Sequence, residues 1–443
     1  MLRRAALFFF SAHDCPPWPM RRISLGHKGL PIGSNPRMFY GWRIVGATFV
    51  SLFISVGFLF YSYGVFFPAL EAEFGGSRFA ISIALAIMNI VMGFSAPFLG
   101  RALDSWSIRN IMLIGAIFVS LGFMLASQIA ALWQFYLLLG TFLGLGAGMI
   151  GQLPSSTLVS NWFIKRRGLA LGIATMGVSL SGVVMAPLTT WLISSVGWRT
   201  TFMLFGALTA GIVTPLVGLI VVNRPEDMGL HPDGATEEDA IELEHNGNAF
   251  SAPYPDFSTR GTFRDRNFWA ITIAISLNFF AMGATLTHMI PHAKDLGISA
   301  LNASFVLTAS AGVGVFGKVL FGYIADFVDS RLALLVSMSF QCCGTILLLF
   351  AETYPMLVVV GAIFGLGMGG VVPLWGTMIG EYFGRESFGR VMGLMGPCML
   401  PIHVFGVPFA GLVFDLTGSY SGAYSTFIGA YALSALSLLI LRR

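Results

Sequence analysis

The sequence predicts an all-α integral membrane protein with twelve transmembrane helices, built as two six-helix repeats. The first observation is composition: 56% of the 443 residues are hydrophobic and 10% are charged, whereas soluble domains carry about 25% charged residues. The second is a series of apolar segments long enough to cross a hydrocarbon core about 30 Å thick. The third is an internal repeat, because motifs of the first half return 221 or 222 residues later.

The first 37 residues differ from everything that follows. They contain several basic residues, scattered Pro and Gly, and one apolar patch from Ala5 to Phe10. That patch is too short to span a membrane and makes only a weak signal-peptide core. We interpret residues 1–37 as a disordered N-terminal extension on the cytoplasmic side.

Twelve apolar segments follow from Tyr40 onward, and each is predicted to be a membrane-spanning helix. They cover approximately residues 42–68, 79–103, 110–130, 133–157, 168–192, 200–222, 267–291, 302–326, 331–351, 354–378, 389–413 and 423–441. The first six define an N-terminal bundle at 38–222, and the last six define a C-terminal bundle at 267–443. Between them, residues 223–266 form the one long polar linker, which we predict to be cytoplasmic and mobile.

Basic residues are concentrated on one side of the predicted spans. Arg101, Lys165, Arg224 and most others fall on the side of the N-terminal extension, whereas the other side has only Arg78, Arg199 and Lys294. Basic loops stay in the cytoplasm. We therefore predict a multi-pass protein of the cell inner (plasma) membrane with both termini cytoplasmic.

The two halves carry matching motifs. The clearest pair is Gly100-x3-Asp104-x4-Arg109 after the second span and Gly322-x3-Asp326-x4-Arg331 after the eighth. Glycine rows at 140–148 and 361–369 also correspond. Two six-helix halves related by an internal repeat are typical of transporters, whose substrate site lies near the midplane between the halves.

The sequence has no recognisable motif for a disulfide framework, metal binding, phosphate binding or catalysis. Adjacent Cys342 and Cys343 lie within a span, which argues against a disulfide framework. There is no paired metal-ligand spacing, phosphate-binding glycine loop or nucleophile elbow. We therefore predict no enzyme activity, no metal and no cofactor. The net charge of +4 does not indicate nucleic acid.

Lys318 is the strongest candidate for substrate binding. It lies in the eighth span, eight residues before Asp326, so it stands about 12 Å up the helix and close to the midplane. An ionisable residue at that depth usually marks a functional site. The alternative is a lysine whose stem extends to the interface, but its reach is only about one helical turn. The matching residue Ala96 shows that the repeat itself requires no lysine.

Three further polar side chains are candidates for the same site. His403 lies between Pro401 and Pro408 and could bind substrate or carry a proton, since its ordinary pKa is about 6.5; it could also pair with carbonyls freed by those prolines. Tyr61 and Gln152 could donate hydrogen bonds to a carboxylate. For each of these two taken alone, a hydrogen bond between helices is the favoured explanation.

Asp104, Arg109, Asp326 and Arg331 are predicted to be parts of a cytoplasmic gate. Charged groups at helix ends can pair across the halves when the inside is closed and separate when it opens. The alternative is that they only set topology, which explains the arginines but not the repeated spacing.

These motifs resemble those of the major facilitator superfamily, in which the loop signature between spans 2 and 3 is repeated between spans 8 and 9. The basic residue that usually follows the Asp is replaced by Ser105 in one half and Phe327 in the other. Within the superfamily, residues 38–443 are similar to the monocarboxylate transporters and the oxalate/formate exchangers. The segments that carry this similarity are 40–42, 63–68, 161–172, 197–199 and 224–229.

The resemblance implies a carboxylate-binding cation in span 8, and Lys318 stands at the matching position, where arginine is commoner. The Asp that many relatives have four residues earlier, implicated in proton coupling, is Gly314 here. A lysine in span 1 of the animal members aligns with Tyr61. The second cation of the oxalate exchangers falls at Met399 or its neighbours. These departures leave the substrate and the coupling ion open.

We therefore predict a secondary transporter that moves a small organic anion, a monocarboxylate, by alternating access together with a proton. Anion exchange is the second choice. Carriers of neutral or cationic metabolites or drugs tend to need acids inside the membrane, and every Asp and Glu here lies in a loop, a terminus or a helix end. A non-transporting membrane sensor is the alternative from another class. Besides the anion, the proton and the bilayer, the sequence indicates no obligate protein partner.

Overall fold

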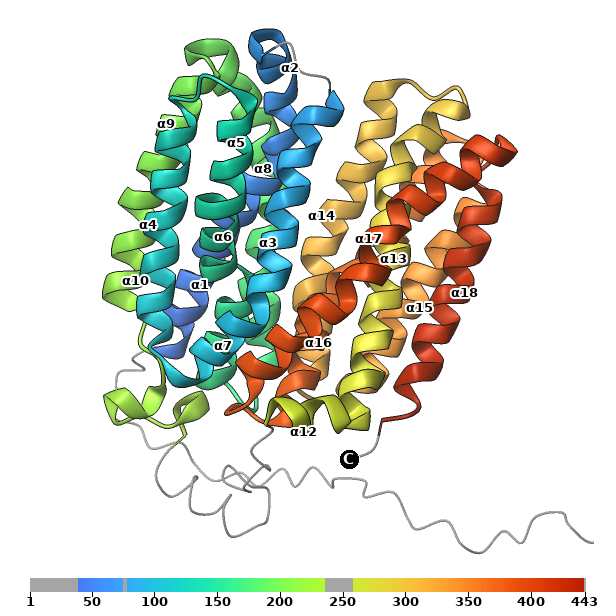
Figure 1. Cartoon of the computed structure of the whole chain (residues 1–443). Helices are drawn as coiled ribbons and strands as arrows, with labels where there is room; N and C mark the ends of the chain where they lie inside the picture. The colour runs from blue at the N-terminus through green and yellow to red at the C-terminus, as the bar shows by residue number, and fades with distance from the viewer. Residues whose placement is uncertain (1–38, 75–77, 236–257, 442–443) are drawn as a thin grey trace, which may run out of the picture. The chain divides into compact units, whose positions relative to one another are not determined.

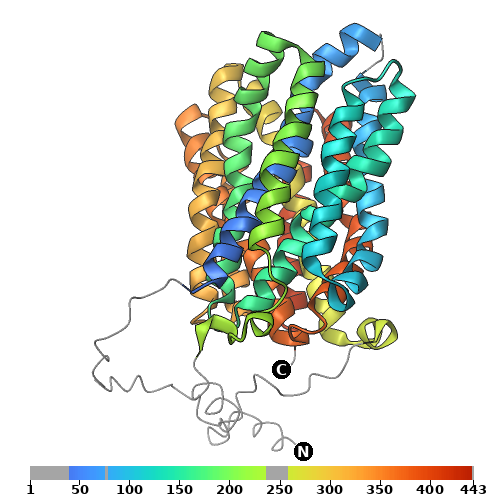
Figure 2. The same cartoon turned by 90° about the vertical axis from the view of Figure 1, so that its left-hand side faces the viewer.

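The computed structural model describes residues 39–74, 78–235 and 258–441. Phe39–Arg443 form one compact unit, shown in Figure 1 and, turned by 90°, in Figure 2. The predicted N-terminal extension and the acidic part of the linker, residues 237–244, lie outside the described residues.

The first half of the unit is a bundle of six helical runs, coloured blue to green in Figure 1. In chain order they are α1 (Gly41–Val56) with α2 (Tyr63–Phe74), α3 (Arg78–Ser105), α4 (Ile108–Ala126), α5 (Leu132–Leu138) with α6 (Gly144–Ile150) and α7 (Gln152–Trp162), α8 (Arg167–Val196), and α9 (Trp198–Leu208) with α10 (Thr214–Ile220). Single π-helical turns join α1 toward α2, α5 to α6, and α9 to α10. The bundle has its own apolar core.

The second half is a bundle of the same kind, coloured yellow to red in Figure 1. It consists of α13 (Arg266–Asp295), α14 (Ala300–Ala325), α15 (Ser330–Leu348), α16 (Tyr354–Phe383), α17 (Phe388–Thr417) and α18 (Ser421–Leu438), preceded by the short α12 (Thr259–Arg264). Its core is divided into two apolar clusters.

Eleven of the runs in the described residues are long and apolar enough to cross a membrane. The twelfth, α18, is rich in Ser and Tyr, which lowers its hydropathy. It packs in the second bundle through Ser434 and Ser437, whose hydroxyls donate to the carbonyls of Ala274 and Ala270 on α13. The predicted fold class, an all-α membrane protein of two six-helix repeats, is confirmed.

The two bundles meet mainly along two helix pairs, α8 with α14 and α3 with α17, with a smaller contact between α8 and α16. Glycine permits both main contacts, because backbones can approach closely where no side chain intervenes. A Cβ atom on Gly172 of α8 would overlap the carbonyl oxygen of Lys318 on α14, and one on Gly100 of α3 would overlap the carbonyl oxygen of Gly389 on α17. We call the end of the bundles where α10 leads into the linker and α18 ends the linker end; it is at the bottom of Figure 1.

Candidate functional site

Lys318 lies where the two bundles touch. Its side chain is buried, with 5% of the residue exposed. Its backbone is held from two sides, by Gly172 of the first bundle and by Gly369 of α16, where a Cβ atom would lie 2.8 Å from the Lys318 nitrogen. A lysine reaching for a lipid interface would be exposed in the isolated protein. The burial of Lys318 therefore disfavours that alternative.

The ammonium group of Lys318 has no recorded hydrogen bond and no ion pair among the described residues. The ion pairs recorded among the described residues all lie at helix ends or in the loops beyond them. A buried charge without a partner is costly, and such charges are normally paired. The site therefore provides a cation whose counter-charge does not come from the described protein groups.

A cavity of about 360 Å³ opens between α13, α16 and α17 of the second bundle. Its lining consists of one polar ring and six apolar or glycine residues: His403, Phe279, Met282, Trp375, Gly396, Met399 and Leu400. Phe279 is the middle ring of three, with its centroid 6.1 Å from that of Trp375 in an edge-on arrangement and 5.5 Å from that of His403. Leu400 also reaches the first bundle at Gly93.

The cavity wall lies close to Lys318 along α16. Trp375 follows Gly369, the residue that touches Lys318, by six residues, or about 9 Å of helix. Leu171 of α8 lies against Gly376, and its neighbour Gly172 lies against Lys318. Lys318 and Trp375 are thus placed around the same short stretch of α8, although Lys318 is not part of the cavity lining.

Tyr61 and His403 each lie against a glycine of a neighbouring helix in their own bundle. The ring of Tyr61 covers Gly182, where a Cβ atom would lie 2.8 Å from it; His403 lies against Gly283, with its Nε2 3.9 Å from a Cβ atom there. The repeat relates Tyr61 to Gly283 and Gly182 to His403. The ring therefore belongs to the first helix of the pair in the first bundle and to the second helix of the pair in the second bundle. Of the two residues only His403 lines the cavity.

Gln152 is the first residue of α7, just after a break in the fourth span. Gly151, with φ −82° and ψ −147°, ends the preceding α6. The side-chain amide nitrogen of Gln152 donates to the Ser156 hydroxyl at 2.6 Å. Its neighbour Leu153 packs against the second bundle. Gln152 is therefore near the junction of the bundles, with its amide N–H already committed to its own helix.

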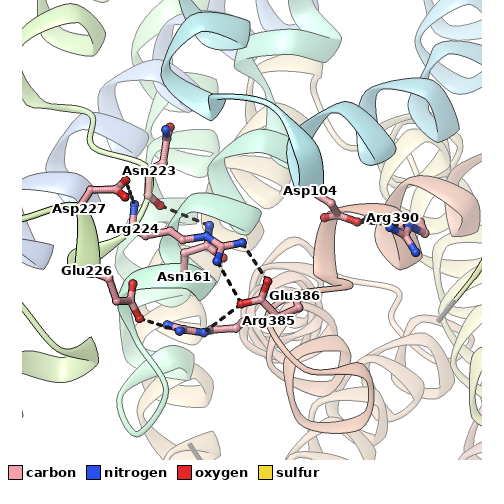
Figure 3. A network of polar contacts seen from close by, with 9 residues as sticks. All are labelled: Asp104, Asn161, Asn223, Arg224, Glu226, Asp227, Arg385, Glu386 and Arg390. Carbon is pink, nitrogen blue, oxygen red and sulfur yellow. Dashed lines mark hydrogen bonds and ion pairs between the residues drawn. The ribbon is translucent and has the colours of Figure 1, made fainter. Parts of the chain in front are cut away.

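Asp104 and Asp326 join the two bundles at the linker end. Asp326 accepts hydrogen bonds from the backbone N–H groups of Gly168 and Leu169, at 2.7 and 3.0 Å. Asp104 accepts one from the backbone N–H of Arg390 at 3.0 Å and lies 3.6 Å from its Nε (Figure 3). The repeat relates Leu169 to Arg390. Each aspartate thus binds the first turn of a helix of the other bundle, where unpaired N–H groups favour an anion.

The environment of Asp326 changes its proton affinity. Burial raises the pKa of this carboxyl to about 6, while the two backbone N–H groups oppose the rise. Of the nearby charges, Asp233 raises this pKa and Arg167 lowers it.

Arg109 and Arg331 take no recorded part in these contacts. The backbone N–H of Arg109 donates to Asn223, and that of Arg331 donates to Asp329. Among the described ion pairs neither guanidinium appears. The structure therefore brings the two predicted gate aspartates to helix starts of the opposite bundle, and not to the arginines of their own motifs.

A second set of contacts, which sequence reasoning missed, ties the start of the linker to the loop between α16 and α17 (Figure 3). Arg224 pairs with Glu386 at 2.9 Å, and Arg385 pairs with Glu226 at 2.6 Å. At the opposite end, the recorded ion pair Arg199–Glu73 stays within the first bundle. Among the described residues, ion pairs between the halves are therefore found at the linker end.

Two helical bundles that meet around a buried cation, joined at one end, have the architecture of a secondary transporter. The family profile described as Major Facilitator Superfamily matches residues 48–326 and 289–443. The chain belongs to this superfamily, whose members are transporters, so the prediction that it is not an enzyme is confirmed.

Several characterised proteins are similar over nearly the whole chain. Monocarboxylate transporter 2 of Homo sapiens is 28% identical over 420 residues, which cover 91% of this chain and 86% of the human protein. Monocarboxylate transporter 13 of Rattus norvegicus is 28% identical over 404 residues, covering 90% and 88%. The crystal structure of the human organic anion transporter MFSD10 (TETRAN) superposes with a TM-score of 0.68 at 15% identity, covering 91% of this chain and all of the human one. That likeness supports the fold.

Proposed function

We propose that the protein is a secondary active transporter that carries a monocarboxylate across the plasma membrane by alternating access. One observation carries the proposal: Lys318 is buried at the junction of the two bundles without a recorded protein counter-charge. A substrate carboxylate would supply that charge, and a single lysine suits one negative charge better than two. The relatives named monocarboxylate transporters support the same substrate class.

We propose that Lys318 binds the carboxylate directly and that His403 is the second polar group of the binding site. His403 lines the cavity and could donate to a second substrate oxygen. Tyr61 and Gln152 remain candidates on the first bundle, because Tyr61 packs on α8, which meets the second bundle, and Gln152 is next to Leu153, which packs against that bundle.

Proton symport is the first choice of coupling and anion exchange the second. The described acids near the bundles lie at helix ends, so a proton that accompanies the substrate would travel on Lys318, on His403 or on the substrate itself. The absence of a recorded protein counter-charge for Lys318 is an argument for exchange. A carrier without substrate would have to reorient with an unpaired buried charge, whereas a loaded carrier would not.

The gate is proposed to be the set of contacts at the linker end. Arg224, Arg385 and Arg390 gather there, and basic residues are retained in the cytoplasm. The linker end would then be the cytoplasmic one, closed here by Asp104 and Asp326. Opening toward the cytoplasm would break these contacts, which supplies the bistable element that alternating access needs.

The test of the function is uptake into proteoliposomes from a panel of labelled acids, with protein-free liposomes as the control. We expect saturable uptake of at least one monocarboxylate and weaker uptake of dicarboxylates. A pH gradient should accelerate uptake if a proton is carried, whereas internal anion should accelerate it if exchange operates. Uptake of cations or neutral compounds but of no acid would refute the proposal, and absence of any flux would favour the sensor.

Acidification is expected to favour closure of the linker end. The closed form holds Asp326 with a pKa of about 6, whereas a solvated aspartate has a value near 3.9. The closed form therefore binds a proton that the open form lacks between about pH 4 and 6, so it gains stability as the pH falls through that window. Asp326→Asn, which is uncharged throughout, should weaken this pH dependence.

Spin labels at the exposed positions Lys165, just before α8, and Phe327, just after α14, would report the closure as a distance between the two bundles. We expect the short-distance population to grow from pH 7.5 to pH 5 in the absence of substrate. Growth of the long-distance population on acidification would contradict the assignment of Asp326.

A further inference from the structure

We propose that the substrate is a monocarboxylate with a bulky apolar group, aromatic or branched, and that this group binds the cavity between α13, α16 and α17. The inference rests on the proposed function, because it places the carboxylate at Lys318. It goes further by naming what the rest of the substrate must be. The residues that would hold the apolar group are Phe279, Met282, Trp375, Met399 and Leu400.

The chemistry of the cavity wall suits an apolar ligand. Apart from His403 and Gly396, every lining residue is apolar. The indole N–H of Trp375 is directed at the sulfur of Met395, 3.4 Å away, so it is engaged inside the protein. A substrate composed of polar atoms alone would lose its water here without gaining hydrogen bonds, which is unfavourable. An apolar group would gain from leaving water.

The shape of the wall points to a flat or branched group. Phe279 stands between Trp375 and His403, and its ring packs against both of theirs. Aromatic side chains pair well with a ligand ring in offset or edge-on geometry. The thioethers of Met282 and Met399 adapt to irregular shapes. The volume of about 360 Å³ lies in the range of sites that enclose drug-sized ligands, so a three-carbon acid would leave most of it unfilled.

The positions of cation and cavity fit a substrate with two separate parts. The backbone of Lys318 on α14 touches Gly369 on α16. Trp375 lies about 9 Å further along α16. A carboxylate held by the Lys318 ammonium could therefore extend its carbon body toward Trp375 and Phe279. All of these groups belong to the second bundle, so the specificity for the apolar group is built into one half of the protein.

The test is competition against uptake of a labelled monocarboxylate in proteoliposomes at pH 7.5. Acetate, lactate and pyruvate would be compared with 3-phenylpropionate, phenylpyruvate and 4-methyl-2-oxopentanoate. We expect the bulky acids to inhibit at concentrations at least tenfold lower than the short ones. Protein-free liposomes with the same additions control for leakage caused by the bulky acids.

Phe279→Ala and Phe279→Leu are the variants that decide where the bulky group binds. Phe279→Ala should weaken inhibition by the phenyl acids about tenfold and leave the short acids unchanged. Phe279→Leu keeps an apolar side chain of intermediate size but removes the ring, and should weaken inhibition by the phenyl acids more than inhibition by the branched one. Phe405→Ala is the matched control, because Phe405 is 55% exposed on α17 and outside the cavity lining.

Two outcomes separate this inference from the function on which it rests. If uptake requires Lys318 but short acids compete as well as bulky ones, or if Phe279→Ala affects all acids equally, the apolar subsite is overturned and the monocarboxylate transporter stands. If no labelled carboxylate, short or bulky, is taken up saturably, the proposed function itself fails.

Discussion

Lys318→Ala is expected to reduce the saturable uptake of a monocarboxylate at low concentration by about 30-fold or more. Lys318 is 5% exposed and lies between two helix backbones, so a carboxylate bound to it would be largely shielded from water. Removing one partner of a buried, hydrogen-bonded charge pair costs about 2–5 kcal/mol, and every 1.4 kcal/mol is a factor of ten. Initial rates of uptake over a range of substrate concentrations would measure the effect.

Lys318→Arg should retain part of this uptake, because it keeps the charge but presents a planar fork in place of a point charge. Lys294→Ala is the matched control: Lys294 is an exposed lysine in the last turn of α13, and its removal should leave uptake unchanged. If Lys318→Ala transports as well as the native protein, Lys318 has a structural role and the site assignment is wrong. The transporter fold would be unaffected.

The fold and the position of Lys318 could be predicted from the sequence because both depend on local patterns. Apolar stretches determine where helices cross, and the Gly-x3-Asp-x4-Arg motifs reveal the repeat without any contact information. Lys318 stands out because a charge inside an apolar run is rare. The same reasoning placed Asp104 and Asp326 at the junction of the two halves, where the structure has them.

The partners of these residues could not be predicted, because they are backbone groups and apolar side chains. Asp326 binds the N–H groups of Gly168 and Leu169, which no pattern of charged residues reveals, whereas the sequence predicted pairing between charged side chains across the two halves. Phe279 and Met282 share one face of α13, and Met399 and His403 share one face of α17. That helical spacing was a usable signal, but apolar residues in a membrane helix usually indicate packing.

Gly172→Val is expected to hold the linker end open and to lower uptake about fivefold or more. A Cβ atom on Gly172 would meet the carbonyl oxygen of Lys318 and the Cα atom of Val319, which are backbone atoms and cannot move independently of α14. Overpacking a close contact costs about 1–3 kcal/mol, which shifts an equilibrium about fivefold to 150-fold. The strain exists only where α8 and α14 touch, so it penalises the closed form and leaves each bundle able to fold.

The distance between spin labels at Lys165 and Phe327 should therefore lengthen in Gly172→Val, while the protein remains monodisperse in detergent. Gly429→Val is the matched control, because a Cβ atom on Gly429 of α18 meets nothing within 4 Å, and it should change neither the distance nor the uptake. A Gly172→Val protein that closes and transports normally would show that the bundles do not need this contact in the transport cycle. Loss of uptake with an unchanged distance would instead place the effect at Lys318, whose backbone the new side chain touches.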